Sequence, residues 1–386
     1  MNISLNTKAL LASLLSAIKV VPSKTALPIL ENFLVNADND SVTVTASNSE
    51  STIVIRMNSE QGYSCTEAGS AVIPARHLLD IVKECNDSQV SIKTLGNGLQ
   101  VRWSAGYADL PTFDVEDYPA VSKDLEGEVV NVDLNAEELV QAITSSVYAT
   151  AEDLARPMLS GLLFDIEGGK MTLVASDGHR LACCPVESLG NYQGPESGSA
   201  CISKKDIAVL KNELELGRDE TAHLSFSDKN AVFTVGNTVI IARCLVGKFP
   251  KWRGVIPSNN ENVLVISRDT LVSVIRRVSV CANKTSNHIK FTLESDLVGA
   301  TLTITAQDLG YGLAAFEKVP VDYHGSNLNI GFKGQFVIDA VNGLRSDKVE
   351  IRFSTERKAV LVLPAEDGKE GRKSNASAVL MPIAVA

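Results

Sequence analysis

Apolar residues recur at helical spacing in three segments that lie at nearly equal distances along the chain. The apolar positions are Leu10, Leu14 and Ile18; Leu139, Ile143 and Val147; and Leu271, Ile275 and Val278. This spacing places each set on one face of an amphipathic helix. A short segment of alternating apolar and polar residues, typical of a strand, precedes each helix. The pattern therefore predicts a strand–helix unit that occurs three times.

A second landmark repeats in register with the first. The similar segments 73–78, 202–207 and 332–337 begin at almost constant intervals (202 − 73 = 129 and 332 − 202 = 130). A third landmark, an Ala followed by a small or polar residue, occurs at Ala46, Ala175 and Ala306. This period is far too long for a solenoid repeat. The sequence thus predicts three domains of one design, with the boundaries 1–127, 128–258 and 259–386.

Each domain is predicted to contain two similar βαβββ halves. After each second helix, alternating residues run into a turn and back out of it, around 96–98, 228–230 and 355–357. Helices on one face of antiparallel sheets give an α+β layer architecture. If all the helices lie on one face of a curved sheet, domains joined end to end bend into an arc. Head-to-tail arrangements of this kind usually close into a ring. Two three-domain chains would then form a six-domain ring.

Composition and charge narrow the class of protein. The chain has 386 residues, 45% of them apolar, and a net charge of −10, which argues against a generally basic nucleic-acid coat but not against a local basic surface. Seven scattered cysteines without a CxxC pair indicate reduced thiols in a cytoplasmic protein, and neither a disulfide framework nor a metal site. No segment approaches the ~20 apolar residues of a membrane span. The apolar segment 9–18 resembles a weak signal peptide, but its counterparts in the other repeats are internal.

Four motifs, in order along the chain, carry a family resemblance. They are Arg156–Gly161 (RPMLSG), Ala175–Leu181 (ASDGHRL), Lys248–Arg253 (KFPKWR) and Val379–Ile383 (VLMPI). Together with Leu27–Leu30 (LPIL), they resemble the bacterial replicative sliding clamp, the β subunit of DNA polymerase III. The resemblance implies three DNA-clamp domains per chain and a head-to-tail homodimeric ring that encircles double-stranded DNA without sequence specificity. It also implies that the ring confers processivity by tethering the DNA polymerase III α subunit, and that it binds the clamp loader and other clamp-motif proteins.

In this family, partner proteins insert a short peptide into a groove between the second and third domains. Carried over to this sequence, the groove set is Leu159, Gly178, His179, Arg180, Leu181, Pro250, Val255, Val379, Met381, Pro382 and Ile383. An apolar slot with a few polar groups at its mouth suits a hydrophobic anchor. Two departures concern the rim: Gly254 stands where the family often has Arg, and the chain ends without a basic residue.

Basic residues recur in and beside the predicted helices. If the helices line a central hole, the DNA-facing set is Lys24, Arg76, Lys83, Arg156, Lys204, Lys205, Arg276, Arg277 and Lys333, with Lys8, Lys19, Lys211 and Arg345 as further candidates. All of these are predicted to lie on helices, except Lys24 and Arg156, which are predicted to lie in loops beside them. Few aromatic residues accompany them, so contact with phosphate and not with bases is expected. We expect the helical segments 74–84 and 274–281 to lie near the seam between two chains.

Two other functional classes stay open at this point. A small hydrolase would use Ser176 and His179, although neighbours on a tight turn point apart and cannot form a triad, and the GxSxG motif is absent. A ring-shaped scaffold would bind proteins but not DNA. No phosphate-binding loop or cofactor motif occurs, so we expect a non-catalytic protein without a cofactor. Residues 365–376, rich in Gly, Glu, Lys and Ser, are predicted to form a surface loop.

Overall fold

The computed structural model describes the chain except for residues 97, 154, 218–219, 296, 298, 366–374 and 385–386. The predicted loop 365–376 therefore lies largely outside the described residues. The chain forms two compact units. Unit 1 contains Met1–Val140, Ser188–Pro195 and Lys205–Cys244, and unit 2 contains Gln141–Glu187, Glu196–Lys204 and Leu245–Ala386.

The α+β prediction is confirmed: in the described residues, each predicted repeat has two α-helices, and the strands pair antiparallel. The helices are α1 (Thr7–Ala17), α2 (Ala75–Glu84), α3 (Ala136–Ser146), α4 (Lys204–Leu216), α5 (Arg268–Ser279) and α6 (Gly334–Gly343). Short 3-10 helices are η1 (Pro28–Glu31), η2 (Ser59–Gln61), η3 (Val147–Ala149), η4 (Pro157–Ser160) and η5 (Trp252–Val255). In the described residues, no helix is long and apolar enough to span a bilayer.

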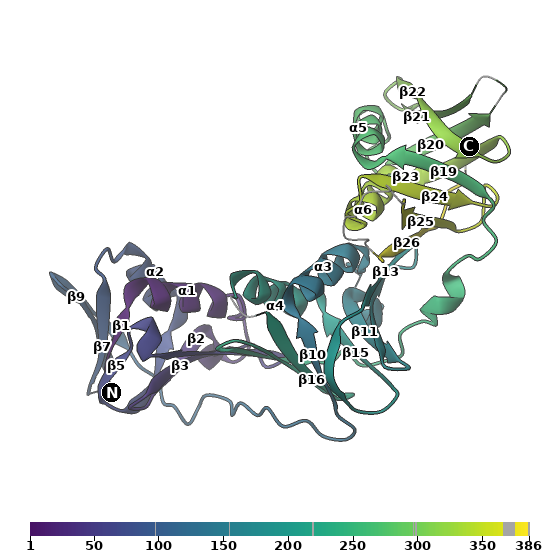
Figure 1. Ribbon diagram of the computed structural model, residues 1–386. Helices are drawn as coiled ribbons and strands as arrows, with labels where there is room; N and C mark the ends of the chain where they lie inside the picture. Colours follow the sequence, from purple (N-terminus) through teal and green to yellow (C-terminus); the bar gives the residue numbers. More distant parts are fainter. Residues whose placement is uncertain are drawn as a thin grey trace. The chain divides into compact units, whose positions relative to one another are not determined.

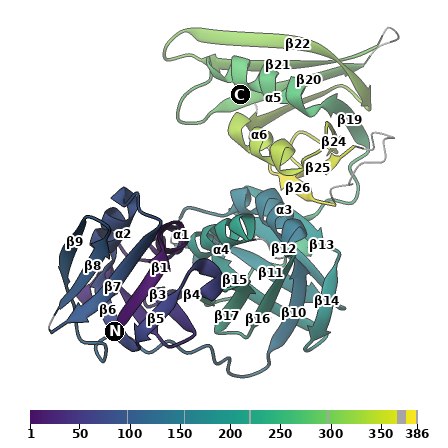
Figure 2. The same ribbon diagram turned by 60° about the vertical axis from the view of Figure 1, so that its left-hand side comes forward.

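The first helix of each repeat packs through the apolar face that the sequence predicts. Leu10 and Leu14 of α1 are buried, and α1 lies beside α2 on the strands of unit 1 (Figure 1). In unit 2, α5 packs beside α6 in the same way (Figure 2). Ile18 and Val147 differ from the prediction, because α1 and α3 end before them and both side chains are only partly buried.

The described residues of unit 1 form two sheets. The first, in spatial order, consists of β5 (Ser64–Glu67), β1 (Asn2–Asn6), β7 (Gln89–Leu95), β8 (Gly98–Trp103) and β9 (Gly106–Pro111). The second consists of β14 (Leu189–Gln193), β10 (Val130–Asn135), β16 (Thr221–Phe226), β17 (Asn230–Val235), β18 (Thr238–Arg243), β4 (Ser51–Asn58), β3 (Ser41–Ser47), β2 (Asn32–Ala37) and β6 (Gly69–Pro74).

In the described part of unit 2, twelve strands form one sheet. Their spatial order is β15 (Ser197–Ser203), β11 (Gly161–Glu167), β12 (Lys170–Ser176), β13 (Arg180–Val186), β26 (Ser377–Leu380), β25 (Val360–Pro364), β24 (Lys348–Phe353), β19 (Asn262–Ser267), β22 (Leu313–His324), β21 (Ala300–Asp308), β20 (His288–Ser295) and β23 (Leu328–Lys333). The three predicted hairpins are present as the pairs β7–β8, β16–β17 and β24–β25.

The two halves of each repeat exchange their first strands. In the first repeat, β1 pairs with β7 of the second half, and β6 pairs with β2 of the first half. The same exchange occurs in the other repeats, where β10 pairs with β16 and β19 pairs with β24. The two halves therefore cannot separate without breaking backbone hydrogen bonds.

Adjacent repeats join edge to edge by antiparallel pairing. In unit 1, β4 of the first repeat pairs with β18 of the second, with Ile53 opposite Ile240. In unit 2, β13 of the second repeat pairs with β26 of the third, with Ala182 opposite Ala378. In each pair, the last strand of one repeat meets the fourth strand of the repeat before it. We call these two pairings the internal junctions.

Candidate partner-binding groove and DNA-facing helices

The predicted groove set is centred on the turn between β12 and β13. The Asp177 carboxylate accepts hydrogen bonds from the amides of His179 (2.8 Å) and Arg180 (3.0 Å). The Ser176 hydroxyl accepts from the Gly178 amide (3.1 Å) and donates to the Arg180 carbonyl (2.8 Å). Gly178 has φ +87°, a conformation that favours glycine. The DGHR segment is therefore a tight turn that leaves Gly178 and His179 exposed.

Arg180 connects this turn to α6. Its Nε donates to the Asp177 carboxylate at 3.0 Å, and its Nη1 donates to the Asp339 carboxylate on α6 at 2.6 Å. Its Nη2 donates to the Tyr148 carbonyl at 2.8 Å. The guanidinium also lies 4.2 Å from the centroid of the Phe336 ring. Arg180 therefore holds the second and third repeats together, and most of its donors are occupied.

Beside the turn, two residues of the groove set are paired across an internal junction. Leu181 lies opposite Val379, and both are buried in one apolar cluster with Trp252. We call this cluster the Trp252 cluster; its buried members are Leu163, Val174, Leu181, Cys183, Cys201, Trp252, Leu361 and Val379. Partly buried residues packed against it are Met158, Leu245, Phe249, Ile256, Ala359 and Leu363.

The other members of the groove set divide into buried and exposed residues. Leu159 is buried within η4. His179, Pro250, Val255, Met381 and Ile383 are exposed. The Met381 amide donates to the His179 carbonyl (2.9 Å), and the Ile383 amide donates to Gly331 on β23 (2.8 Å). These two bonds fix the described end of the C-terminal segment, which includes the partly buried Pro382.

The groove set does not include Met158, Phe249 and Leu361, which pack in or against the Trp252 cluster. Two of them lie inside the motifs RPMLSG and KFPKWR, so their position in those motifs was an available signal. Leu361 could be found only from the pairing of β25 with β26, which places it opposite Val379.

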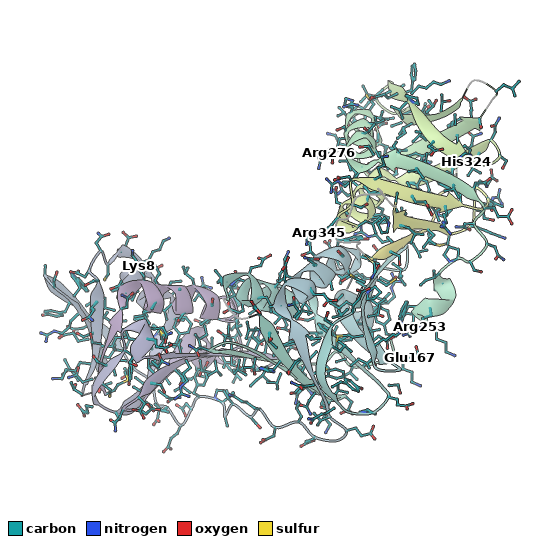
Figure 3. All side chains as sticks on the ribbon, in the orientation of Figure 1. Lys8, Glu167, Arg253, Arg276, His324 and Arg345 are labelled. Atoms are coloured by element: carbon teal, nitrogen blue, oxygen red, sulfur yellow. The ribbon has the colours of Figure 1, made fainter. Side chains whose placement is uncertain are left out.

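The connector that carries Pro250 and Val255 is anchored to β11. The Trp252 indole donates to the Asp165 carboxylate at 2.9 Å. Arg253 contacts the same carboxylate at 2.7 Å and Glu167 at 2.8 Å, and Figure 3 shows Arg253 and Glu167 in this region. A Cβ added at Gly254 would meet no atom within 4 Å. The space beside Gly254 is therefore open.

The residues of the DNA-facing set are exposed, except Lys333, which is partly buried. Arg76 and Lys83 lie on α2, Lys204 and Lys205 begin α4, and Arg276 and Arg277 lie on α5. Three predicted helical positions are not helical. Lys19 follows α1, Lys333 ends β23 next to the Phe336 ring, and Arg345 follows α6 with φ +54°. Figure 3 labels Lys8, Arg276 and Arg345, all of them exposed.

Three lysines of unit 1 converge. Lys19, Lys205 and Lys211 line a hollow of about 540 Å³ with Ala208, Val209, Asn212 and Glu215. Lys24 is also exposed in the loop after α1, and Arg156 donates to the Asp177 carbonyl at 3.3 Å. Lysines from α4 and Lys19, which follows α1, therefore gather around this hollow in unit 1.

Arg277 is already paired. Its guanidinium donates two hydrogen bonds to Glu317 on β22, at 2.9 and 2.6 Å. The hydrogen bond from Arg277 lowers the pKa of the Glu317 carboxyl. A bidentate pair of this kind holds the arginine in place, so Arg276 is freer than Arg277 to contact phosphate.

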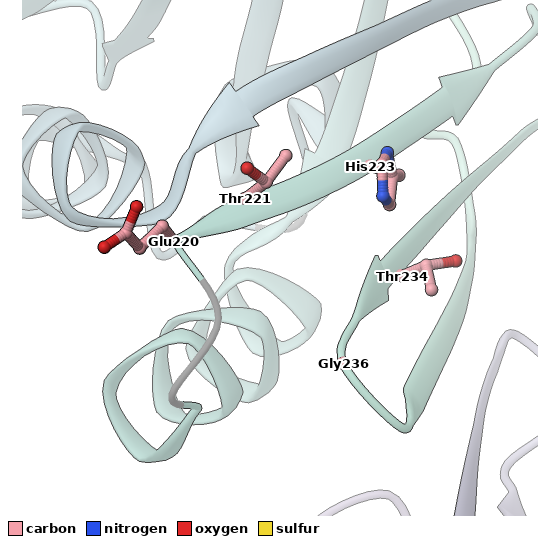
Figure 4. A pocket seen from close by; sticks show the side chains of 5 residues that line it. All are labelled: Glu220, Thr221, His223, Thr234 and Gly236. Carbon is pink, nitrogen blue, oxygen red and sulfur yellow. The ribbon is translucent and has the colours of Figure 1, made fainter.

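The contacts of Ser176 and His179 do not resemble a hydrolytic site. Among the described residues, the Ser176 hydroxyl forms hydrogen bonds with the backbone of its own turn, and no hydrogen bond joins it to the His179 ring. A more polar pocket of about 320 Å³ lies elsewhere, lined by Glu220, Thr221, His223, Thr234 and Gly236 (Figure 4). His223 Nδ1 contacts the Asp133 carboxylate, which also accepts from Asn191. In the described part of the chain, no group of three His, Cys, Asp or Glu side chains could hold a metal ion.

Comparisons with known proteins agree with this architecture. Models of the DNA polymerase III beta subunit match in chain order: the N-terminal domain at residues 1–122, the central domain at 133–251 and the C-terminal domain at 253–383. The beta sliding clamp of Haemophilus influenzae is 27% identical over 99% of this chain and 100% of its own length. That of Caulobacter vibrioides is 28% identical, with both chains fully covered.

Solved structures are similar over the whole chain. The DnaN sliding clamp of Pseudomonas aeruginosa bound to griselimycin has 26% sequence identity, a TM-score of 0.90 and complete coverage of both chains. The beta sliding clamp of C. crescentus has 25% identity and a TM-score of 0.89, and the match covers 100% of this chain and 99% of that one. With three successive domains matched in order, the chain belongs to the DNA polymerase III beta subunit family, the beta sliding clamps.

Proposed function

We propose that this protein is a DNA sliding clamp, a homodimeric ring that encircles duplex DNA and tethers the replicative polymerase and other replication and repair proteins. The observation that carries the proposal is the repeated clamp domain, joined twice by the same kind of strand pairing. A chain of such repeats has one strand edge left at each end. A second copy, placed head to tail, would pair both edges and close six domains into a ring.

The proposed role is non-catalytic and cytoplasmic. Retention on DNA would come from topological enclosure, so the contacts to phosphate can stay weak enough to permit sliding. The DNA-facing set supports this role by placing exposed cations on α2, α4 and α5. A clamp loader would open the ring, and partners such as the DNA polymerase III α subunit would bind the groove set.

The domain boundaries 1–127, 128–258 and 259–386 are part of this proposal. The matched spans of the family models support three domains but place the third from residue 253. We retain 258 as the end of the second domain, because Trp252 and Arg253 in the connector bond to Asp165 on β11.

The test is retention on circular DNA. The clamp is loaded onto nicked circular plasmid by a clamp loader and isolated by gel filtration at high salt. We expect it to remain bound and to be released when the plasmid is linearised, because a ring can slide off a free end. Release at high salt from the circular plasmid would contradict enclosure. A dimeric protein that never associates with circular DNA would instead indicate a protein-binding scaffold.

Reversing the charge of lysines in the hollow of unit 1 tests whether this hollow faces DNA. Lys205→Glu with Lys211→Glu, in the hollow of unit 1, should weaken DNA association at low salt, because each phosphate contact that is lost removes favourable counterion release. Lys358→Glu, an exposed lysine in the β24–β25 turn, is the control and should have little effect. Equal losses in both proteins would indicate a general charge effect and remove the hollow from the lining.

A further inference from the structure

The turn at the centre of the groove set has a counterpart in the first repeat. In the turn after β3, the Asn48 side chain accepts hydrogen bonds from the amides two and three residues ahead, at 2.9 and 2.7 Å, as the Asp177 carboxylate does in the turn between β12 and β13. Ser49 has φ +74° at the position where Gly178 has φ +87°. A serine hydroxyl before each turn donates to the backbone carbonyl four residues ahead. Residues 47–51 are therefore the counterpart of the turn in the groove set.

The strand that passes the turn corresponds as well. The Arg243 amide donates to the Glu50 carbonyl at 2.9 Å. The Met381 amide donates to the His179 carbonyl at the same distance. Since β4 pairs with β18 as β13 pairs with β26, these two bonds lie at equivalent ends of the internal junctions. Glu50 and Arg243 therefore occupy the positions of His179 and Met381.

An apolar cluster accompanies the turn in both repeats. The cluster of the first repeat, which we call the Tyr118 cluster, consists of the buried Leu30, Val72 and Tyr118 and the partly buried Ile29, Leu34 and Val115. Its strand positions match those of the Trp252 cluster, because β2 and β6 pair in the register of β11 and β15. Tyr118 and Trp252 each follow an apolar residue of their cluster by three positions. The first repeat thus contains counterparts of both the turn and the Trp252 cluster.

Large apolar side chains are exposed beside the Tyr118 cluster. Leu27 is 50% exposed, and its carbonyl accepts a hydrogen bond from the Leu30 amide at 3.0 Å. Phe113 is 46% exposed, and its amide donates to the Val72 carbonyl at 3.2 Å. Both hydrogen bonds join an exposed residue to a buried member of the cluster. Exposed apolar side chains that gather at one place are typical of a site for another protein.

The Tyr118 hydroxyl is buried without an acceptor. Tyr118 is 5% exposed, and no group of the described residues accepts a hydrogen bond from its hydroxyl. The Ser47 amide lies beside the phenolic oxygen, but an amide N–H donates and cannot accept. Burial raises the pKa of Tyr118 to about 12, so the hydroxyl keeps its proton at neutral pH. A buried donor without an acceptor is costly, and the backbone carbonyl of a bound segment would satisfy it.

The charge of this surface differs from that of the groove set. Its exposed carboxylates are Glu31, Glu50, Asp114, Glu116 and Asp117. They outnumber the exposed cations Lys24 and Arg243, and none of them forms an ion pair with a described cation. Glu50 and Glu116 stand at positions where the groove set has no carboxylate. Because complementary charge favours one partner over another, this surface selects a positively charged segment.

Going beyond the proposed ring, we propose that the Tyr118 cluster and the turn 47–51 form a second docking surface, whose occupant is an extended segment of a partner protein with an apolar anchor flanked by lysine or arginine. The anchor packs against Leu27 and Phe113. A backbone carbonyl of the segment accepts from the Tyr118 hydroxyl, and the basic flanks face Glu50 and Glu116. Two surfaces of one design would thus bind segments of different charge.

Binding of a basic apolar peptide tests this surface. The probe is the fluorescein-labelled peptide Lys-Lys-Leu-Phe-Lys-Lys, whose anisotropy is measured with the full-length protein. We expect saturable binding that weakens by about tenfold or more for Leu27→Ser with Phe113→Ser, because the apolar contact is lost. Both positions are exposed, so folding should be unaffected. Val246→Ser, at an exposed apolar position outside this surface, is the control and should bind normally.

The same assay separates this surface from the groove set. Met381→Ser removes an exposed apolar member of the groove set and should leave the affinity for the peptide unchanged. Binding lost in Met381→Ser but kept in Leu27→Ser with Phe113→Ser would place the peptide in the groove set and overturn the proposal. No binding to the unmodified protein, or equal binding of a peptide with Ser-Ser in place of Leu-Phe, would also overturn it.

Charge reversal tests the selectivity of the surface. Glu50→Lys with Glu116→Lys should weaken peptide binding by about fivefold, because the basic flanks lose their attraction. The matched control, Glu84→Lys with Glu356→Lys, changes the net charge equally at two exposed positions elsewhere and should have little effect. Equal losses in the two variants would indicate a general charge effect and overturn the proposal.

Sedimentation tests whether a second copy of this chain is the occupant instead. Leu27→Ser with Phe113→Ser should leave the oligomeric state unchanged. A loss of assembly in this variant would show that another copy covers the surface, and would overturn the partner segment. The peptide assay requires neither DNA nor a closed ring, so its failure would leave the proposed clamp intact.

Discussion

Arg180 shows how a residue in a recognisable motif can have a role that the motif does not reveal. The resemblance assigns it to the partner groove, and the structure places its guanidinium between Asp177, Asp339 and two aromatic rings. The sequence could predict the turn, because Asp and Gly favour it. It could not predict the bond to Asp339, which depends on contact between residues far apart in the chain.

Replacing Arg180 should therefore destabilise the protein. Arg180→Ala leaves Asp177 and Asp339 without their cation, and we expect a loss of about 2–3 kcal/mol in the free energy of unfolding. Arg253→Ala is the matched control: it also removes two carboxylate contacts, but its side chain is 48% exposed against 11% for Arg180. We expect a loss under about 1 kcal/mol there. Urea unfolding measures the free energy of unfolding of both variants, and equal losses would contradict the predicted difference between Arg180 and Arg253.

His288 should make stability depend on pH. Burial lowers the pKa of His288 below its usual range, and its Nε2 has no hydrogen-bond partner among the described residues. The unfolded chain therefore binds a proton at a higher pH than the folded chain does, so stability falls as pH drops below about 6.5. His288→Gln should flatten the fall in melting temperature between neutral pH and about pH 5. His324→Gln, at an exposed position, should leave the slope unchanged; an unaltered slope in both would exclude His288 as its source.

At the scale of elements, local patterns predicted the helices, whereas the pairing of strands far apart in the chain could not be predicted. Leu10, Leu14, Leu271 and Ile275 revealed their helices, because helical spacing is a local property. The exchange of β1 and β6 between halves was not foreseen, since nothing in a strand's own sequence names its neighbour. Lys333 and Arg345 were assigned to a helix and lie just outside it, where helix ends are hardest to place.

Deleting the C-terminal segment tests the partner groove independently of the dimeric ring. Deleting residues 381–386 removes the Met381–His179 and Ile383–Gly331 hydrogen bonds and the exposed apolar side chains beside the turn. We expect binding of a clamp-motif peptide to be lost in calorimetry, because these residues belong to the groove set. Strand β26 remains, so the dimer should persist in sedimentation. Unchanged peptide affinity would remove the segment from the binding site.

At the scale of the whole molecule, the sequence predicted three domains because their landmarks repeat, and it could not predict how edges meet. The register emerged only from the pairings Ile53–Ile240 and Ala182–Ala378. Landmarks can be counted along a chain, whereas a register depends on which edges face each other.

Tyr107 on β9 and Phe316 on β22 are exposed aromatic side chains. Apolar contacts of such residues at the seam of the proposed ring would have a measurable effect on assembly. Charges across an interface weaken as salt screens them, but apolar burial does not. We therefore expect the dissociation constant of the dimer to change by less than about threefold between about 0.1 and 0.5 M sodium chloride. Sedimentation equilibrium over a range of protein concentrations measures it. A steep weakening with salt would indicate that ion pairs, and not Phe316 and Tyr107, hold the seam.

The repeated junction geometry also determines where a ring of this kind would break. The internal junctions join strands that the polypeptide already tethers, so each edge meets its mate at a high effective concentration. A seam between two chains of the proposed ring would have no such tether, and its formation would cost translational and rotational entropy. Internal junctions and seams with similar contacts would therefore differ in lifetime, and the seams would be the shorter-lived. A ring built from six similar joints opens at the two that the covalent chain does not span, and these are the joints on which a loader can act.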